Sequence, residues 1–359
     1  MKAVYIHIPF CNNICSYCDF CKMYYNPKII SNYLDNLENE IKTRYQNEII
    51  SSLYIGGGTP SSLSYSELER LLNITKIFKV SNDLEFTIEV NPESLSLDKI
   101  KLLKEYEVNR VSIGVQSFND KIIKELNRDH DKDMVFKVVN MLKENNITNI
   151  NIDLMYGINS DINIIKEDLD NYLKLDIPHL SYYSLIIEDN TMFSINKREY
   201  IDEDIDYNMY KYINDTLKKH GYIHYETSNY AKPHYESKHN LVYWNNEEYY
   251  GFGLSAVSYL NNYRLTNTKN ISKYLKGIYL DNSIYEDVDI QKQNTIILGF
   301  RKLEGINLTN YQNRYHENLL DNKIVISLIK EGKLEVSNNY LRISDKYFYI
   351  SNEILINFI

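Results

Sequence analysis

The sequence predicts an α/β protein built on an open, partial (β/α)6 barrel of the TIM type, and two patterns in its first 190 residues lead to this prediction. Short strand-like segments alternate with amphipathic helical segments, which favours parallel pairing of the strands. Within each strand, apolar and polar residues also alternate. A closed barrel fills its interior with apolar side chains and cannot easily bury such a polar face. An open barrel whose lumen holds water or a ligand can accommodate a polar inner face. The alternative is an antiparallel sheet with one face exposed to solvent.

The expected strands follow one another along the first half of the chain. Helical segments between them show apolar residues at spacings of three and four, as in Tyr33, Leu34, Leu37 and Ile41. On the strands, polar residues alternate with apolar ones, and we expect them to face the lumen. The six strands are predicted over residues 3–8, 52–56, 85–91, 110–116, 149–155 and 180–185.

The chain beyond residue 200 is predicted to form a smaller α+β region, so the expected domains are residues 1–200 and 201–359. A helix is expected around residues 207–219. The end of the chain, 319–359, has the pattern of a helix, a short hairpin (334–336 and 340–343) and a second helix opening at Ser351. This order resembles a winged helix, which we interpret as a packing or partner surface.

Composition excludes several function classes. The net charge of −9 argues against nucleic-acid binding, which needs a concentrated positive surface. No apolar run reaches the roughly 18 residues of a membrane span, although peripheral association stays open. The first residues lead straight into a strand, so we expect no signal peptide and a cytoplasmic protein.

All four cysteines lie between Cys11 and Cys21, where they cannot close long loops as disulfides. The sequence therefore predicts a metal site.

The cysteines form a C-x3-C-x2-C motif at Cys11, Cys15 and Cys18, directly after the first strand. Thiolates are the usual ligands of iron–sulfur clusters, and three of them leave one iron of a four-iron cluster open for a ligand. The alternatives are a zinc site that recruits Cys21, or incidental thiols. Zinc sites usually combine two separated pairs of ligands, and the sequence has no second pair. The spacing favours a 4Fe–4S cluster.

The segment Tyr-Ile-His-Ile-Pro-Phe-Cys that ends at Cys11, with the cysteine motif and Asp19-Phe20, resembles the radical S-adenosylmethionine (SAM) proteins related to coproporphyrinogen dehydrogenase. The resemblance covers nearly the whole chain. It implies that SAM chelates the open iron and that an electron from the cluster cleaves its sulfonium bond to give a 5′-deoxyadenosyl radical. It also implies a reductant such as flavodoxin or ferredoxin.

A glycine-rich stretch follows the second strand. Glycines let the backbone approach a ligand closely, although Gly56-Gly57-Gly58-Thr59-Pro60 could also be a plain tight turn. The resemblance implies that it contacts the amino group of SAM. Arg128 and Asp153 could instead form a structural ion pair. The SAM-contacting positions implied by the resemblance are Tyr5, Tyr17, Gly57, Gly58, Thr59, Glu89, Gln116, Arg128 and Asp153.

A second motif, His-Asn-Leu-Val-Tyr-Trp at residues 239–244, resembles the one that marks a haem-chaperone branch of this family. It implies His239 as a haem ligand, and imidazole is a good iron ligand. A lone histidine is more often structural, which is the alternative. Two departures from the family pattern are Leu254-Ser255-Ala256, where relatives tend to carry a histidine, and the spacing of Cys21 from Cys18.

Three functions follow from the resemblance. The first is a chaperone that carries haem as cargo and delivers it to recipient haemoproteins. The second is oxygen-independent decarboxylation of coproporphyrinogen III to protoporphyrinogen IX in porphyrin biosynthesis. The third, weaker one is another radical reaction on a tetrapyrrole. The intact motif at 239–244, the spacing of Cys21 and the start of the chain at the cluster strand favour the first. Whether SAM is turned over, and so whether the protein is an enzyme, stays open.

Overall fold

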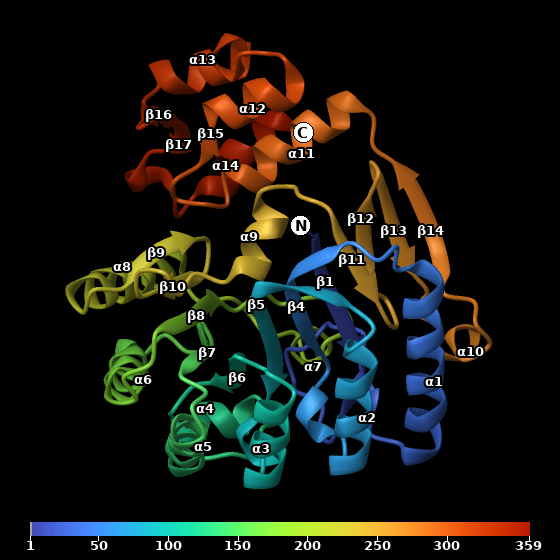
Figure 1. Ribbon diagram of the computed structural model, residues 1–359. Coiled ribbons are helices and arrows are strands. Elements are labelled where there is room, and N and C mark those ends of the chain that lie inside the picture. The colour runs from blue at the N-terminus through green and yellow to red at the C-terminus, as the bar shows by residue number, and fades with distance from the viewer. Residues whose placement is uncertain (1) are drawn as a thin grey trace.

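A large twisted sheet forms the centre of the computed structural model, which describes residues 2–359 (Figure 1). Its six middle strands are neighbours in the order β1-β4-β5-β6-β7-β8, and each pairs in parallel with the next. The prediction of six parallel strands in a partial barrel is therefore confirmed. These strands are β1 (Lys2–Ile8), β4 (Ile49–Gly57), β5 (Lys79–Val90), β6 (Arg110–Gln116), β7 (Asn149–Tyr156) and β8 (His179–Ser184).

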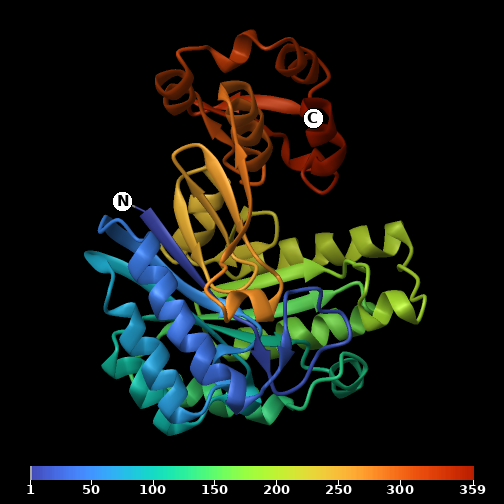
Figure 2. The same ribbon diagram turned by 90° about the vertical axis from the view of Figure 1, so that its right-hand side faces the viewer.

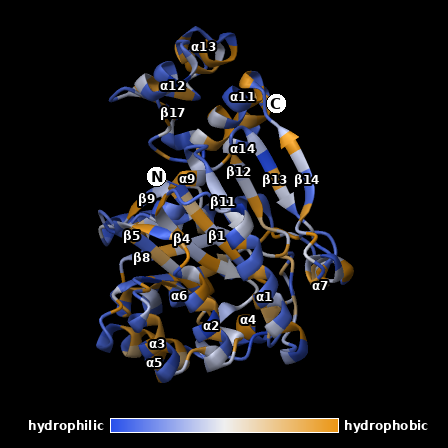
Figure 3. Cartoon of the chain, turned by 45° about the vertical axis from the view of Figure 1, so that its right-hand side comes forward, coloured by the Kyte–Doolittle hydropathy of each residue, from blue (hydrophilic) through white to orange (hydrophobic). Residues whose placement is uncertain are grey.

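Amphipathic helices cover the outer face of these strands. Figure 3 shows hydrophilic and hydrophobic residues mixed along them, as expected for helices with one face on a core. In α2, for example, Ser64 and Glu67 form a capping box, and Leu68, Leu71 and Leu72 are buried. The outer helices are α1 (Pro27–Arg44), α2 (Tyr65–Thr75), α3 (Leu97–Glu105), α4 (Asp120–Glu125), α5 (Lys132–Glu144) and α6 (Ile162–Lys174).

The inner face of the strands is polar and internally hydrogen-bonded. Asn151 lies at its centre, where its amide nitrogen donates to the Ser112 hydroxyl at 2.7 Å and to Asp153 at 2.8 Å. The Asn151 carbonyl oxygen lies 2.6 Å from His179 Nδ1. Because buried polar groups are costly unless they are bonded, this network makes the polar lumen stable.

Strands from beyond residue 200 extend the same sheet at both edges. On one side, β11 pairs in parallel with β1 and is followed by β12, β13 and β14; on the other, β10 pairs with β8 and β9 follows. The sheet and one apolar core, which runs from Val4 to Tyr274, therefore continue past residue 200, and the expected domain boundary there stays a prediction. The added strands are β9 (Ile223–Glu226), β10 (Asn229–Ala231), β11 (Tyr249–Phe252), β12 (Val257–Leu260), β13 (Tyr263–Asn267) and β14 (Leu280–Tyr285).

The last segment forms a separate C-terminal unit with its own core, from Ile296 to Phe358. Figures 1 and 2 show it standing beyond one end of the sheet. The expected helix, hairpin and helix are present as α13, β16–β17 and α14, while the likeness to a winged helix stays a prediction. The unit contains α11 (Val288–Gly299), β15 (Ile306–Asn307), α12 (Leu308–Tyr315), α13 (Lys323–Lys330), β16 (Leu334–Ser337), β17 (Tyr340–Ile343) and α14 (Ser351–Leu355).

Short elements complete the chain. The predicted helix at 207–219 is present as α8, which begins a turn earlier. Within residues 2–359, no helix is both long and apolar enough to cross a membrane. The remaining strands and helices are β2 (Phe10–Cys11), β3 (Met23–Tyr24), α7 (Met192–Ile195), α8 (Glu203–Lys219), α9 (Lys238–Trp244) and α10 (Ile271–Tyr274).

Candidate cluster and cofactor site

A cavity of about 460 Å³ opens at the carboxyl ends of the middle strands, where barrel proteins bind their ligands. All the predicted site residues line it except Tyr5 and His239. The predicted residues that line the cavity are Cys11, Cys15, Tyr17, Cys18, Gly57, Gly58, Thr59, Glu89, Gln116, Arg128 and Asp153.

The cysteine loop is fixed at several points between β2 and β3. The Ser16 N–H donates to the Leu126 carbonyl at 3.1 Å, and the Ser16 carbonyl accepts from Phe193 N–H at 3.1 Å. The Asn13 amide donates to the Asn127 carbonyl at 2.8 Å. Contacts with two distant segments, one at residues 126–127 and one at Phe193, therefore hold the loop at the cavity mouth.

Each cysteine of the motif has a distinct surrounding. Burial raises the pKa of the Cys11 thiol to about 11, and the Thr59 hydroxyl lies 3.6 Å from its sulfur. Burial also raises the pKa of Cys18, and nearby Lys22 offsets part of this rise. Arg128 Nη1 lies 3.4 Å from the sulfur of Cys15. Since metals bind the thiolate, iron binding here releases protons and gains from these cationic and hydroxyl neighbours.

The three thiols line one cavity, as ligands of a shared cluster must. Among residues 2–359, no group of three or more His, Cys, Asp or Glu side chains is arranged to hold a single metal ion. A 4Fe–4S cluster places each thiolate on a different iron atom, so its ligands do not converge on one point. The cavity lining of the described residues holds three thiols and no fourth, which fits such a cluster with one open iron.

The glycine-rich stretch needs glycine at each position. Gly57 has φ +114°, and a Cβ there would lie 2.4 Å from His7 Nδ1. A Cβ on Gly58 would lie 2.8 Å from the Pro9 carbonyl carbon and 3.0 Å from the Cys11 sulfur, and one on Gly56 would lie 2.6 Å from the Glu89 carboxyl carbon. Real Cβ contacts are not this short. The stretch is therefore both a tight turn and a close contact between the cluster loop and the carboxylate of Glu89.

Glu89 projects from β5 into the lumen. Its carboxylate accepts from the Gly57 N–H at 3.0 Å and from the Tyr54 hydroxyl at 2.8 Å. Burial raises the pKa of Glu89 to about 7, from an ordinary value of 4.5. The group therefore titrates near neutrality, and a bound cation would favour its charged form.

Arg128 bridges the cysteine loop and the strand ends. Its Nη2 donates to Asn91 Oδ1 at 2.9 Å and to the carbonyl of Gly114. Burial opposes its charge, but Tyr17 and Cys15 outweigh burial and raise the pKa of Arg128. No ion pair joins Arg128 to Asp153 within the described residues, because Asp153 accepts from Ser112 at 3.1 Å instead. The alternative of a structural ion pair is therefore wrong.

Gln116 ends β6 in a conformation unusual for a non-glycine residue, with φ +70°. The register of β6 against β7 shifts at this point, which turns the side chain toward the cavity. Its Oε1 accepts from the Tyr183 hydroxyl at 2.8 Å. Such strained residues persist where the surroundings hold them, often at functional sites.

Three further residues shape the cavity and were not among the predicted site residues. Tyr54 and Tyr183 hold Glu89 and Gln116, and the Asn91 amide donates to the Thr59 hydroxyl at 3.3 Å. All three lie on strands or at strand ends, where the alternating pattern could have identified them.

Tyr5 lies outside the cavity lining, and its contact with SAM stays a prediction. It projects from β1 into the lumen below the cavity, and its hydroxyl lies 3.0 Å from His7 Nδ1. Its ring packs against those of Tyr54 and His239, with centroid distances of 6.1 and 6.4 Å. Because it sits deeper in β1 than the cluster loop, it supports residues that reach the cavity.

His239 has no free ring nitrogen for a haem iron in this structure. It is 1% exposed; Nδ1 lies 2.8 Å from the Ser52 hydroxyl and Nε2 lies 2.8 Å from the Tyr243 hydroxyl. Backbone N–H groups at the start of α9 donate to Glu85, which fixes the helix under the lumen. Burial lowers the pKa of His239 to about 3. Both ring nitrogens therefore have partners in this structure, and the role of His239 as a haem ligand stays a prediction.

A half-open parallel barrel with a C-x3-C-x2-C loop and a glycine turn at its mouth defines the radical SAM class. The sequence profile of the radical SAM superfamily matches residues 5–169. Membership implies a 4Fe–4S cluster and SAM as cofactors, and the donor set of the cavity fits both.

Comparison with curated proteins shows the particular family. The chain is 38% identical to the heme chaperone HemW of Lactococcus lactis subsp. lactis (strain IL1403), over 100% of this chain and 97% of that protein. It is 35% identical to the heme chaperone HemW of Bacillus subtilis (strain 168), over 99% and 98%. The chain therefore belongs to the HemW family.

A solved structure shares the fold. Coproporphyrinogen III oxidase (HemN) from Escherichia coli, a radical SAM enzyme, superposes with a TM-score of 0.86 over 99% of this chain and 89% of that chain. The sequences are 23% identical, so this likeness concerns the fold alone.

Proposed function

We propose that this protein binds haem and delivers it to recipient haemoproteins, with the cluster and SAM site as part of its machinery. The observation that carries this proposal is the match to two heme chaperones over 97% and 98% of their lengths. Oxidative decarboxylation of coproporphyrinogen is the competing function, and only a likeness of fold supports it.

Different residues of the cavity would bind the cluster and SAM. Cys11, Cys15 and Cys18 would hold the cluster, which with SAM supplies one-electron chemistry when bound. Glu89 and the Gly57 loop would bind the amino group of SAM. Arg128 presents a buried positive charge beside Cys15 and can offset the negative charge of a reduced cluster.

The chemistry of the cluster site also bears on where the protein works and on which partner reduces the cluster. We propose that the protein works in the cytoplasm, where thiols stay reduced and a cluster can persist. A small electron carrier such as flavodoxin or ferredoxin would reduce the cluster. The position of the cysteine loop at the cavity mouth supports this, because electron transfer needs close approach of the donor.

The test uses one anaerobically reconstituted sample of the full chain. We expect iron and inorganic sulfide in equal amounts, a Soret band on addition of haem, and transfer of that haem to an apo-haemoprotein. We expect no protoporphyrinogen from coproporphyrinogen III when SAM and a reductant are added. Turnover of coproporphyrinogen, or the absence of any haem binding, would contradict the chaperone proposal.

The pH dependence of SAM binding tests the role of Glu89. Below its pKa of about 7 the carboxyl is neutral and cannot attract the SAM ammonium; above it the carboxylate can. We therefore expect SAM affinity to rise with pH toward neutrality, by up to about tenfold per unit below the pKa, and then to level off. Equilibrium binding of SAM to the reconstituted protein measures this.

Glu89→Gln is the matched variant for this dependence. It keeps the size of the side chain and an oxygen that can accept from Tyr54 or Gly57, but it cannot ionise. We expect weaker SAM binding by about tenfold or more near pH 8 and little change with pH below that. An unaltered pH profile in the glutamine variant would exclude Glu89 as the titrating group.

A further inference from the structure

A second cavity, of about 470 Å³, lies away from the cluster. Its walls come from α8, from β9 and β10, and from the C-terminal unit. We call it the aromatic cavity, because six of its lining residues carry aromatic rings. These are Tyr207, Tyr210, Tyr222, His224, Tyr230 and Phe348.

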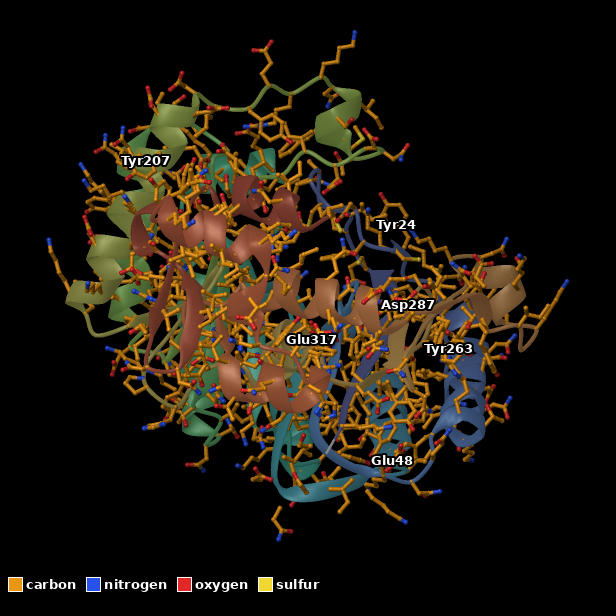
Figure 4. The ribbon with its side chains drawn as sticks, turned by 90° about the horizontal axis from the view of Figure 1, so that it is seen from above. Tyr24, Glu48, Tyr207, Tyr263, Asp287 and Glu317 are labelled. Atoms are coloured by element: carbon orange, nitrogen blue, oxygen red, sulfur yellow. The ribbon has the colours of Figure 1, made fainter. Side chains whose placement is uncertain are left out.

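The rings of the aromatic cavity offer flat, apolar walls. The His224 ring stacks on that of Tyr230, with centroids 4.4 Å apart and planes 15° apart, and Phe348 meets His224 edge-on at 5.5 Å. Tyr207, labelled in Figure 4, lies on α8 where its ring meets Tyr349 of the C-terminal unit at 5.0 Å. Walls of this kind suit a planar ring system.

The charges around the aromatic cavity favour an anionic ligand. Lys211 and Lys218 lie on the same side of α8 and line the cavity, and neither forms an ion pair within residues 2–359. Asp345 also lines it, but Arg342 neutralises that carboxylate at 2.9 Å. Asp215 is the remaining acidic residue of the lining. Two free ammonium groups at the edge of a flat apolar cavity match a ring that carries carboxylates.

His224 supplies a group that can bind iron. Burial lowers its pKa to about 4, so the ring is neutral at physiological pH, the form that ligates metals. Its Nε2 makes one long contact, 3.3 Å from the Thr227 carbonyl. His239, by contrast, has both ring nitrogens in short hydrogen bonds.

The other large cavities are less suited to a haem. The first must hold the cluster and SAM. A third, beside Trp244 and Lys302, measures about 270 Å³, below the usual range of about 300–1,000 Å³ for ligand pockets. The aromatic cavity is within that range and combines flat walls, an imidazole and free cations.

We propose that the aromatic cavity binds the haem cargo, with His224 donating a nitrogen lone pair to the iron and Lys211 and Lys218 facing the propionates. This inference rests on the proposed function. The iron–nitrogen bond would replace the contact between His224 Nε2 and the Thr227 carbonyl. The proton that Nε2 carries there would move to Nδ1 by exchange with water, so the ring stays neutral and the oxidation state of the iron does not change. The ring would lie between α8 and the C-terminal unit.

Haem titration of the reconstituted full chain tests the proposal, with His224→Ala as the main variant. We expect His224→Ala to shift the Soret band and weaken haem binding at least tenfold, while iron and sulfide content stay normal. Added imidazole should restore the wild-type spectrum, which a merely misfolded variant would not show. His239→Gln should keep the wild-type band.

The role of Lys211 and Lys218 is tested separately. Both are exposed on α8, so their replacement leaves the core intact. Lys211→Glu with Lys218→Glu should weaken haem binding about tenfold or more, while Lys219→Glu, on the same helix but outside the cavity lining, should not. If wild-type protein binds haem and the His224 and lysine variants bind it equally well, the location is wrong and the chaperone proposal stands. If wild-type protein binds no haem, both proposals fail.

Discussion

Alanine in place of Cys15 is expected to abolish the 4Fe–4S cluster. Cys15 is one of three thiols at the cavity mouth, and the described residues near it offer no spare thiol in the cavity lining. Loss of one thiolate leaves a second iron without a protein ligand, and clusters held this way are lost. The same result is expected for Cys11→Ala and Cys18→Ala. Iron and sulfide per chain after anaerobic reconstitution, with the broad visible absorbance of the cluster, measure the effect.

Cys21→Ala is the matched control for this loss. Cys21 follows the motif closely, but it is not part of the cavity lining. Its backbone carbonyl lies 2.7 Å from Nε2 of His7, which is also outside the cavity lining. We therefore expect a normal cluster in Cys21→Ala. If this variant loses iron and sulfide to the same extent, the cluster does not rest on three thiolates alone.

Alanine in place of Gly57 is expected to remove most SAM binding. The backbone of Gly57 has φ +114°, which an L-residue adopts only with strain, and the new Cβ would lie 2.4 Å from His7. The loop would have to move, and its N–H would leave the carboxylate of Glu89, to which it now donates at 3.0 Å. We expect SAM affinity to fall at least tenfold, equivalent to about 1.4 kcal/mol, as measured by equilibrium binding to reconstituted protein.

Gly332→Ala separates the effect of backbone strain from the effect at the site. Gly332 also has a positive φ, +68°, but a Cβ there would meet no atom within 4 Å. This variant should lose some stability and keep normal SAM affinity. Equal SAM affinity in Gly57→Ala and wild-type protein would show that the glycine turn does not contact the cofactor.

The central strands and much of the cavity could be predicted from the sequence because their signals are local. Alternation along β5 and β7 directs Glu89 and Asp153 toward the lumen, whatever the rest of the chain does. The cysteine loop and the glycine turn directly follow strands, so the parallel arrangement brings them to one edge. These residues do line one cavity.

The remaining features depend on partners distant in sequence. Strand β11 has only four residues, and nothing in it indicates that it pairs with β1. For that reason the sequence alone does not show that the sheet continues past residue 200. The motif containing His239 specifies residue types, but its ring nitrogens are taken by Ser52 and Tyr243, which only the folded structure reveals. Tertiary contacts, rather than local pattern, decide such roles.

The pairing of β1 with β11 has a consequence for how the chain folds during synthesis. Strand β1 is synthesised long before its neighbour β11, so one edge of β1 stays unpaired while the intervening chain is made. Until then, unpaired backbone groups beside the nascent cysteine loop are open to aggregation. Such long-range pairing slows folding. A fragment ending near residue 200 should therefore aggregate. Assembly of the cluster should follow completion of the sheet.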